Sequence, residues 1–525
     1  MGWSQPKETR DQLVLFPEKL DEVVSVEHPV RQLDAILEKV NWSSWEAGYV
    51  LTKGQPPIHP RVLAGVILYG LLKRVRTSRA LEEALQVRLD FRWLAEGRHI
   101  DHSTIAGFRS GHTEALSDLF VQIGLIAQQM GHLTLVRLGY DGTRLRASNR
   151  RSGTRTPEEL REMKQRLAAE FETHRQAVEQ AQANEDEVFD AAVAAVASNR
   201  ADKEQELSRQ SDQIDAALAE IARIESEGKK VPDRLPITDP QSRISKNKEG
   251  GFAPNYNPTA TVDADSGLIA ACDVISGIDE QSHMHEAVEQ VRENFMQGDE
   301  ADREIEVLAD GLMATGENIA ACEAKNVDLY TPAGPEHPAY REDPTQPIAA
   351  EKIADLPLRG KRPKKGEPDT RTFDKSAFVY DAESDVYYCP MGKQLERRSQ
   401  RKDHTGAQRF LYRASKSDCR SCPLAEKCFK NTRQQYGRRI ECGVHERAKQ
   451  SHTRRMQSET SRTKYAQRAA VTERPFAVIK RHFGVREFLV RGLRKVRCEW
   501  NWLCIAHNLQ RLLSLGQQRA RAAIP

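Results

Sequence analysis

The stretch Leu133-Thr-Leu-Val-Arg-Leu-Gly-Tyr-Asp141 is an apolar, strand-like run that ends on an acidic residue. A second run of this kind, Ile305-Glu-Val-Leu-Ala-Asp310, lies much later in the chain. Alternating apolar patterns at 256–263, 267–274 and 327–331 predict three more strands. Helical patterns at 283–296 and 315–325 separate the later strands. Because strands and helices are interleaved in this way, the predicted fold class is α/β.

The order of these elements along the chain indicates a particular fold more specifically than their presence does. One of the first three strands ends on Asp141. The next strand, which a helix separates from those three, ends on Asp310. This order predicts an RNase H-like mixed sheet flanked by helices. An aspartate at a strand end is most often a turn or cap residue. The other acids of this region are interpreted in that way, namely Asp263, Asp265, Asp273 and Asp279.

A third acid, Glu473, lies in a helical segment at 466–482. Carboxylates on different elements can converge on two divalent ions, roughly 3.5–4 Å apart, that clamp the attacking and leaving oxygens of a phosphodiester. Mg²⁺ prefers oxygen ligands and keeps several waters, which leaves coordination positions for phosphate and nucleophile. Asp141, Asp310 and Glu473 are therefore the candidate catalytic, metal-binding residues of a nuclease or strand-transfer enzyme.

Lys480 follows Glu473 along the same helical segment. The two residues are seven positions apart, and at about 100° per residue this separation returns the Lys480 side chain to nearly the same helix face as Glu473. Lys480 is therefore a candidate catalytic-site residue that contacts phosphate beside the metals. The alternative is a solvated lysine on a basic helix.

Length and composition indicate a multidomain protein without membrane spans. The chain has 525 residues, of which 39% are hydrophobic. No segment reaches the roughly 18–20 consecutive apolar residues of a membrane span, and the first residues lack a signal-peptide core. We therefore expect a cytoplasmic protein.

Charge is distributed unevenly along the chain. The net charge of the whole chain is +3, but two segments have strong charges of opposite sign. Residues 158–230 contain 18 acidic and 10 basic residues (net −8). Residues 393–440 contain 14 basic and 4 acidic residues (net +10). A localised basic region is typical of proteins that bind nucleic acid. Lys73, Arg74, Arg76 and Arg79 form a second basic group, which suits DNA contact or a solvated edge of a plain helical bundle.

Changes in composition divide the chain into seven segments. Residues 1–130 are predicted to form an all-α N-terminal DNA-binding domain, and 131–156 the first part of the catalytic domain. Residues 157–230 form a long helical, coiled-coil-like insertion, and 231–335 the second part of the catalytic domain. Residues 336–376 are a basic linker, 377–445 a Cys-rich, zinc-ribbon-like basic insertion, and 446–525 the C-terminal helical part that carries the glutamate.

Five of the nine cysteines lie between residues 389 and 442. An odd number of cysteines without an export signal argues against a disulfide framework. Cys389, Cys419, Cys422 and Cys428 supply four thiolates in knuckle-like turns, which predicts a structural, tetrahedral Zn²⁺ site. Cys442 is an alternative ligand, and reduced cysteines without metal are the alternative to zinc.

Several motifs, taken in order, resemble one family. They are Asp141-Gly-Thr-Arg-Leu-Arg-Ala-Ser, Val262-Asp263, Ala309-Asp310-Gly, Glu473-Arg-Pro-Phe-Ala-Val-Ile-Lys480 and Glu499-Trp-Asn-Trp-Leu-Cys-Ile-Ala-His-Asn-Leu509. Together they look like the IS1182 group of DDE transposases, within the broader IS4/IS5-like bacterial insertion-sequence collection. The likeness covers nearly the whole chain and rests on the order of the motifs.

The resemblance implies an RNase H-like domain with an Asp-Asp-Glu triad and two Mg²⁺ or Mn²⁺ ions. By position, Asp141, Asp310 and Glu473 are the triad. The implied activity is binding to the terminal inverted repeats, cleavage at the ends and joining of the 3′-OH to target DNA. The implied partners are double-stranded DNA and further copies of the chain, as a homodimer or higher oligomer on DNA, in the bacterial cytoplasm and associated with the nucleoid.

One part of the family pattern is not matched. The wider group has the signature Tyr-x2-Arg-x3-Glu-x6-Lys, in which Glu473 and Lys480 keep their spacing. Tyr465 and Arg468 lie one residue too far upstream of Glu473, so their roles stay open. Two other functions also stay open: a catalytically silent, transposase-derived DNA-binding protein, and a metal-dependent nuclease without strand transfer.

Overall fold

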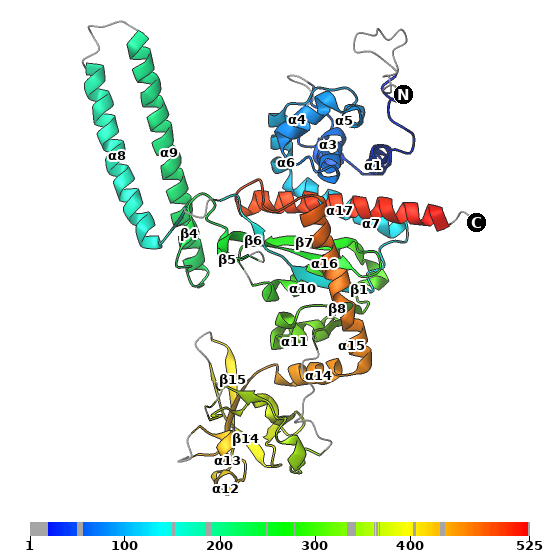
Figure 1. Cartoon of the computed structure of the whole chain (residues 1–525), viewed down its shortest axis with the longest axis vertical. Helices are drawn as coiled ribbons and strands as arrows, with labels where there is room; N and C mark the ends of the chain where they lie inside the picture. The colour runs from blue at the N-terminus through cyan, green and yellow to red at the C-terminus, as the bar shows by residue number, and fades with distance from the viewer. Residues whose placement is uncertain are drawn as a thin grey trace, which may run out of the picture.

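The computed structural model describes residues 19–49, 56–149, 153–183, 191–247, 250–277, 279–332, 343–361, 368–402, 406–430 and 436–522, together with Pro363 and Gly366. The protein is mixed α/β and has three visibly separate parts (Figure 1): a central body, a helical arm and a smaller β module. Across the described residues, none of the helices has both the length and the apolar character needed to cross a lipid bilayer.

The N-terminal part of the body is helical. Its helices are α1 (Pro29–Leu37), α2 (Ser43–Glu46), α3 (Pro60–Leu72), α4 (Ser78–Val87), α5 (Leu89–Leu94), α6 (His102–Gly111) and α7 (Thr113–Gln129). The helix α3 begins at Pro60 and buries nearly every residue, because the other helices surround it. Asp101 caps α6 by accepting hydrogen bonds from the Ser103 and Thr104 amides at 2.8 and 3.1 Å. Both helix starts agree with the sequence pattern.

A mixed sheet forms the centre of the body. Its strands β7 (Ile269–Ile275), β6 (Phe252–Asp263) and β1 (Arg137–Gly142) pair antiparallel, and β1, β8 (Ile305–Leu308) and β9 (Val327–Tyr330) pair parallel. The short strands β2 (Leu145–Arg146) and β5 (Arg243–Lys246) extend the sheet along the first half of β6. The five strands predicted from the sequence are therefore present. The parallel pairing of β1 with β8 brings their carboxyl ends to one edge.

Helices cover this sheet. They are α10 (Met284–Phe295), α11 (Gly316–Ala324), α16 (Arg468–Ala477) and α17 (Leu493–Ala522), and α16 continues into a π-helical turn at Val478–His482. The helix α16 lies tightly on β1 at Gly139, where an added Cβ would be only 2.7 Å from side-chain atoms of Val471 and Thr472. Trp500 and Trp502 are buried and anchor α17 by donating to the Thr259 and Arg109 carbonyls.

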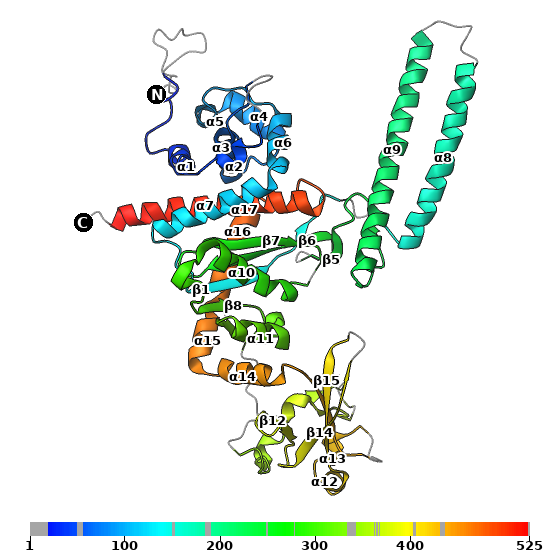
Figure 2. The same cartoon turned by 180° about the vertical axis from the view of Figure 1, so that it is seen from behind.

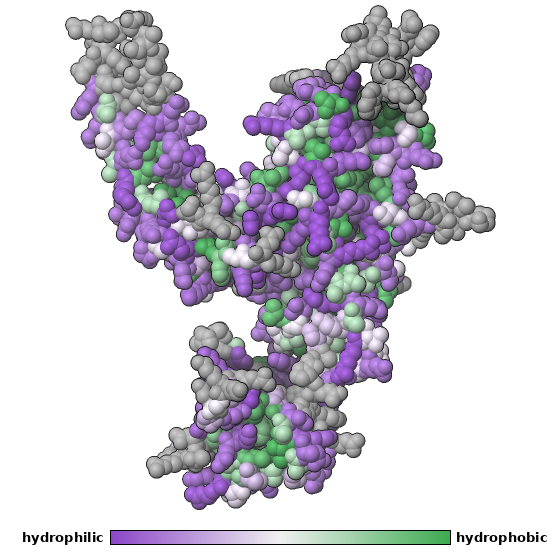
Figure 3. Space-filling model, in the orientation of Figure 1, coloured by the Kyte–Doolittle hydropathy of each residue, from purple (hydrophilic) through white to green (hydrophobic). Residues whose placement is uncertain are grey.

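An antiparallel pair of long helices, α8 (Pro157–Ala183) and α9 (Ala191–Ser226), projects from the body as an arm (Figures 1 and 2). Its two apolar clusters are small and lie between the helices, with Leu160, Ala217 and Ile221 in one and Leu167, Leu207 and Ile214 in the other. The strands β3 (Thr154–Arg155) and β4 (Leu235–Pro236) pair at its base. The outer surface of the arm is mostly hydrophilic in Figure 3.

The β module lies at the opposite end of the molecule from the N-terminal helices (Figure 2). Its sheet runs β12 (Val379–Asp381), β13 (Val386–Tyr388), β14 (Gln394–Lys402), β15 (Gln408–Ala414) and β16 (Arg439–Gly443). The module has its own hydrophobic core, separate from that of the body. Part of the segment predicted as a basic linker joins this core through Ile348, Leu356 and Phe373. The chain returns to the body through α14 (Glu446–Met456) and α15 (Glu459–Ala466).

Candidate active site

Asp141 and Asp310 lie together at one edge of the central sheet. The parallel register pairs Leu138 with Val307 and Gly139 with Leu308, so each aspartate lies two residues beyond the last of these pairs. Asp310 starts a 3₁₀ turn, in which its Oδ1 accepts from the Leu312 amide at 2.9 Å. The Oδ2 atoms of Asp141 and Asp310 both contact another residue, Arg468. The fold thus brings together two acids that are far apart in sequence.

Both Oδ2 atoms face the same guanidinium nitrogen. Arg468 Nη2 lies 3.1 Å from Asp141 Oδ2 and 3.8 Å from Asp310 Oδ2. The Arg468 side chain is only 15% exposed, against 47% for Asp310, so the cation lies deep between the acids. Tyr465 lies nearby, and burial raises the pKa of its phenol while the Arg468 charge opposes that rise. The sequence left these two residues without a role, and the structure places them at the candidate site.

Helix geometry explains the position of Glu473. Arg468 and Glu473 are five residues apart, which at about 100° per residue rotates Glu473 roughly 140° away from the arginine. The residue one full turn after Arg468 is Thr472, which is fully buried against Gly139. Glu473 is exposed on the next face of α16. The extra residue between Arg468 and Glu473, compared with the family signature, therefore places Glu473 on a different helix face from Arg468.

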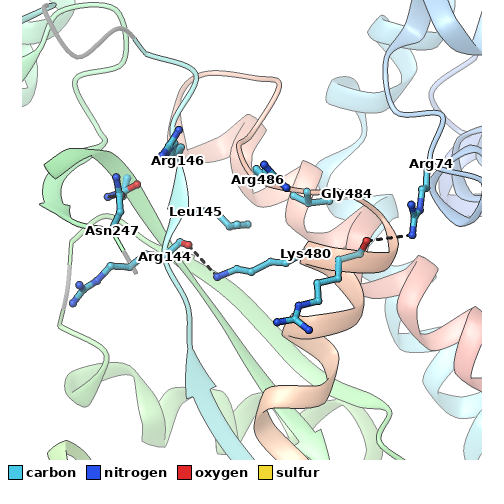
Figure 4. A pocket seen from close by; sticks show the side chains of 11 residues that line it. Arg74, Arg144, Leu145, Arg146, Asn247, Lys480, Gly484 and Arg486 are labelled. Atoms are coloured by element: carbon cyan, nitrogen blue, oxygen red, sulfur yellow. Dashed lines mark hydrogen bonds between the residues drawn. The ribbon is translucent and has the colours of Figure 1, made fainter. Parts of the chain in front are cut away.

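Lys480 extends towards the loop that follows Asp141. Its ammonium group donates to the Thr143 hydroxyl and to the Arg144 carbonyl, the latter at 3.2 Å (Figure 4). The π-helical turn that contains Lys480 is wider than an α-helical turn, a feature that is frequent at functional sites. Lys480 is thus held beside the strand that carries Asp141.

A strongly basic pocket adjoins this loop. It has a volume of about 580 Å³, and Figure 4 shows its lining, which comes from the N-terminal helices, the β1–β2 loop and the segment after α16. Its cationic residues are Arg74, Arg144, Arg146, Lys480, Arg481 and Arg486. Asn247 Nδ2 and Asn255 Oδ1 also line it, and both are buried atoms without a hydrogen-bond partner in the described part of the chain. Such a pocket can bind the phosphate groups of a nucleic acid.

Three of the four predicted zinc ligands, Cys389, Cys419 and Cys428, belong to the same core of the β module. Burial raises the pKa of Cys428 to about 12, and the charges of Cys422, Cys389 and Cys419 contribute to this rise. Backbone amides donate to two of the sulfurs at 3.4 Å, from Lys393 to Cys389 and from Arg438 to Cys419. Hydrogen bonds of this kind orient metal-bound thiolates in zinc sites. The four thiols therefore lie within electrostatic range of each other.

Cys442 lies elsewhere in the module. It is on β16, opposite Phe410 of β15, and burial raises the pKa of its thiol. The groups that influence that pKa most are Lys375, Glu446, Tyr387 and Tyr412. Of the two ligand sets that the sequence left open, this placement favours the one without Cys442.

At neither candidate metal site do the described ligands surround a common point where a metal ion could bind. In the ranges that the structure describes, no three His, Cys, Asp or Glu side chains form a cluster that could hold a metal ion. At the aspartates, Arg468 takes the place between the two acids.

Two family models match parts of the chain. A family model described as Transposase DDE domain matches residues 388–513, and one described as Transposase domain (DUF772) matches residues 18–111. These two domains indicate that the protein is a transposase. Their combination is characteristic of IS1182-family transposases. No curated protein and no solved structure matched the chain.

The matched regions of the transposase do not contain every candidate residue. The DDE-domain match includes Glu473, Lys480 and the cysteines from 389 to 442, whereas Asp141 and Asp310 lie outside both matches. Their assignment therefore depends on the sheet register and on their shared contact with Arg468. Glu280 is a further acid near these two aspartates that the sequence pattern did not indicate.

The basic group predicted for DNA contact is used in part within the transposase itself. Arg76 forms a largely buried ion pair with Glu499 at 3.1 Å and donates to the Glu487 carbonyl at 2.8 Å. Arg74 donates to backbone carbonyls of Arg481 and His482 at the rim of the basic pocket. These arginines join the helical N-terminal part to the C-terminal segment. Arg76 therefore has a structural role instead of the predicted DNA contact.

The basic pocket gives a prediction about DNA affinity. Replacing Arg144 or Arg486 by alanine is expected to weaken binding of the transposase to duplex DNA, because each arginine lines the basic pocket. Each substitution should also lower the slope of log affinity against log salt by about 1. Fluorescence anisotropy at several salt concentrations measures both quantities. Arg161→Ala, an exposed arginine on the arm, is the control, and equal losses in control and pocket variants would contradict the prediction.

Proposed function

We propose that the transposase binds the terminal inverted repeats of its insertion sequence, cleaves the DNA at the ends and joins the freed 3′-OH to target DNA. The observation that carries this proposal is the convergence of Asp141 and Asp310 on one cationic nitrogen of Arg468. Two carboxylates from parallel strands that share a cation can also share a divalent metal ion. Metal-assisted phosphoryl transfer requires such a site.

The strand order supports an RNase H-like fold for the catalytic domain. Three antiparallel strands, β7, β6 and β1, continue into the parallel strands β8 and β9. The first acid lies on the central strand β1, and the second lies just beyond the end of its parallel neighbour β8. An active site at the carboxyl ends of these strands agrees with the general placement of ligand sites in α/β sheets.

The donor atoms at this edge fit Mg²⁺ or Mn²⁺, because carboxylate oxygens are preferred ligands of both ions. Asp141, Asp310 and Glu473 are the proposed holders of two such ions. The chemistry that these ions supply when bound is activation of the attacking oxygen and stabilisation of the leaving oxygen. Glu473 is on the exposed face of α16, so a shift of that helix or of its side chain would have to accompany metal binding.

The remaining residues of the site act on DNA. Lys480 lies at the basic pocket, where its ammonium group can bind a phosphate next to the scissile one. Arg468 carries a charge that a DNA phosphate can attract away from the two aspartates, and Tyr465 lies beside it. These residues would position the DNA backbone, and correct positioning supplies a large part of the rate enhancement in phosphoryl transfer.

The β module is proposed to hold a structural Zn²⁺ through Cys389, Cys419, Cys422 and Cys428. The mutual influence of their thiols and the two amide-to-sulfur hydrogen bonds support this assignment. The module is also basic, so it is proposed to contact DNA. Because two transposon ends must be cut and joined together, the active form is proposed to be a homodimer or higher oligomer on DNA, in the bacterial cytoplasm at the nucleoid.

The test is a cleavage and joining assay with the full chain. A labelled duplex that carries the inverted repeat flanking the gene is incubated with the protein, Mg²⁺ and a supercoiled target plasmid. The expected products are DNA cut at the repeat end and label joined to the plasmid. Binding without cleavage would indicate a silent DNA-binding protein, and cleavage without joining would indicate a nuclease. Either outcome would overturn the proposal.

A further inference from the structure

Glu280 lies at the same edge of the sheet as the two aspartates. It precedes the short 3₁₀ turn Gln281–His283 and the helix α10, between the end of β7 and the start of that helix. Its backbone carbonyl accepts a hydrogen bond from the Tyr140 hydroxyl at 3.1 Å, and Tyr140 is the neighbour of Asp141 on β1. The position of Glu280 is thus tied to the catalytic strand.

The carboxylate of Glu280 occupies space that Gly142 leaves open. A Cβ atom added at Gly142 would lie 2.5 Å from the Glu280 carboxyl carbon and 2.6 and 2.9 Å from its two oxygens. Gly142 directly follows Asp141, so any larger residue there would push the carboxylate away. The absence of a side chain at position 142 therefore allows a third acid to approach the strand that carries Asp141.

A second residue fixes the orientation of this carboxylate. Asn257 Nδ2 donates to Glu280 Oε1 at 2.7 Å, and the Asn257 side chain is almost completely buried in β6. The carboxylate is therefore held from two sides, by the strand at Gly142 and by the amide of Asn257. A side chain held in this way is preorganised, which is typical of residues that position a ligand.

Charged groups of the candidate site lie near Glu280. Asp141, Asp310 and Arg144 are close enough to influence the charge of its carboxylate, and Asn257 donates a hydrogen bond to it.

We propose that Glu280 is a further acidic residue of the active site and contributes a carboxylate to the divalent-cation site of Asp141 and Asp310. This inference rests on the proposed function. The geometry that carries it is the close approach to Gly142, the hydrogen bond from Asn257 and the shared edge of the sheet. Arg468, which lies between the two aspartates, would have to move for a cation to bind there.

The test measures Mn²⁺ binding to the full-length, metal-free protein by electron paramagnetic resonance. Glu280→Gln keeps the size of the side chain and an acceptor for Asn257 but removes the charge. The expected result is a loss of Mn²⁺ affinity of about 10-fold or more, the usual range for residues that support a metal site. Glu286→Gln is the control, because Glu286 is an exposed acid on α10 paired with His283 at 2.9 Å.

A second variant keeps the proposal testable if Glu280→Gln does not fold. Gly142→Ala would place a methyl group where the Glu280 carboxylate lies, and it should weaken Mn²⁺ binding in the same direction. Asp310→Asn serves as the reference. If Asp310→Asn loses Mn²⁺ affinity while Glu280→Gln and Gly142→Ala keep it, the inference about Glu280 is wrong. If Asp310→Asn also keeps full affinity, the proposed metal site itself fails.

Discussion

Asp310→Asn is expected to abolish cleavage of the transposon end while leaving DNA binding nearly unchanged. The substitution removes one of the two carboxylate charges that converge on Arg468 Nη2. A divalent ion held by these carboxylates stabilises transition-state charge by several kcal/mol, so its loss should lower the cleavage rate about a thousandfold or more. DNA affinity should not fall, because the change removes a negative charge from a phosphate-binding surface.

Two measurements separate these effects. Single-turnover cleavage of a labelled inverted-repeat duplex in Mg²⁺ gives the rate, and gel shift in Ca²⁺ gives the affinity. Asp141→Asn should behave in the same way, since Asp141 makes the closer contact, 3.1 Å, with the same nitrogen. Asp279→Asn is the matched control: Asp279 is an exposed acid whose carboxylate accepts from the Ser282 hydroxyl at 3.0 Å. A variant of Asp310 that still cuts at the wild-type rate would remove this residue from the active site.

Cys428→Ser is expected to remove zinc from the protein and to unfold much of the β module. Structural zinc contributes roughly 10 kcal/mol or more to the folding of small domains that depend on it. Among the described residues of the module, twelve buried apolar residues form the core, and Cys428 and Cys442 are among them. A core of this size gives limited stability without a metal or another cross-link.

Metal analysis of the reduced, purified protein measures the first effect, with one Zn²⁺ per chain expected for the wild type and close to none for Cys428→Ser. Limited proteolysis measures the second. Cys442→Ala should keep its zinc, because Cys442 lies on β16 opposite Phe410 and is not one of the four proposed ligands. A wild-type protein with little zinc would rule out the site.

The pKa values of the cysteines add a dependence on pH. Burial and neighbouring charges raise the pKa of Cys389, Cys419 and Cys428, so without metal these thiols stay protonated at neutral pH. Each must lose its proton to bind zinc. Zinc affinity should therefore fall as the pH falls, and competition with a chelator between pH 8 and pH 6 should show this trend, with more zinc released on the acidic side.

The sequence by itself determined the features that depend on neighbouring residues. Apolar alternation placed the strands that end near Asp141 and Asp310, because the pleat of a strand is set within a few residues. Composition likewise indicated the long helices of the arm. Order along the chain also indicated the transposase family.

Only the tertiary structure decided which distant groups meet. Arg468 lies between the two aspartates because α16 crosses β1 at Gly139, and no local pattern fixes that crossing. The Glu280 carboxylate lies against Gly142 because Gly142 has no side chain, and Arg76 pairs with Glu499 because two remote segments pack together. One residue along a helix changes direction by about 100°, so spacing alone could not show that Thr472, and not Glu473, faces the strand. Contacts of this kind follow from packing, which depends on the whole chain at once.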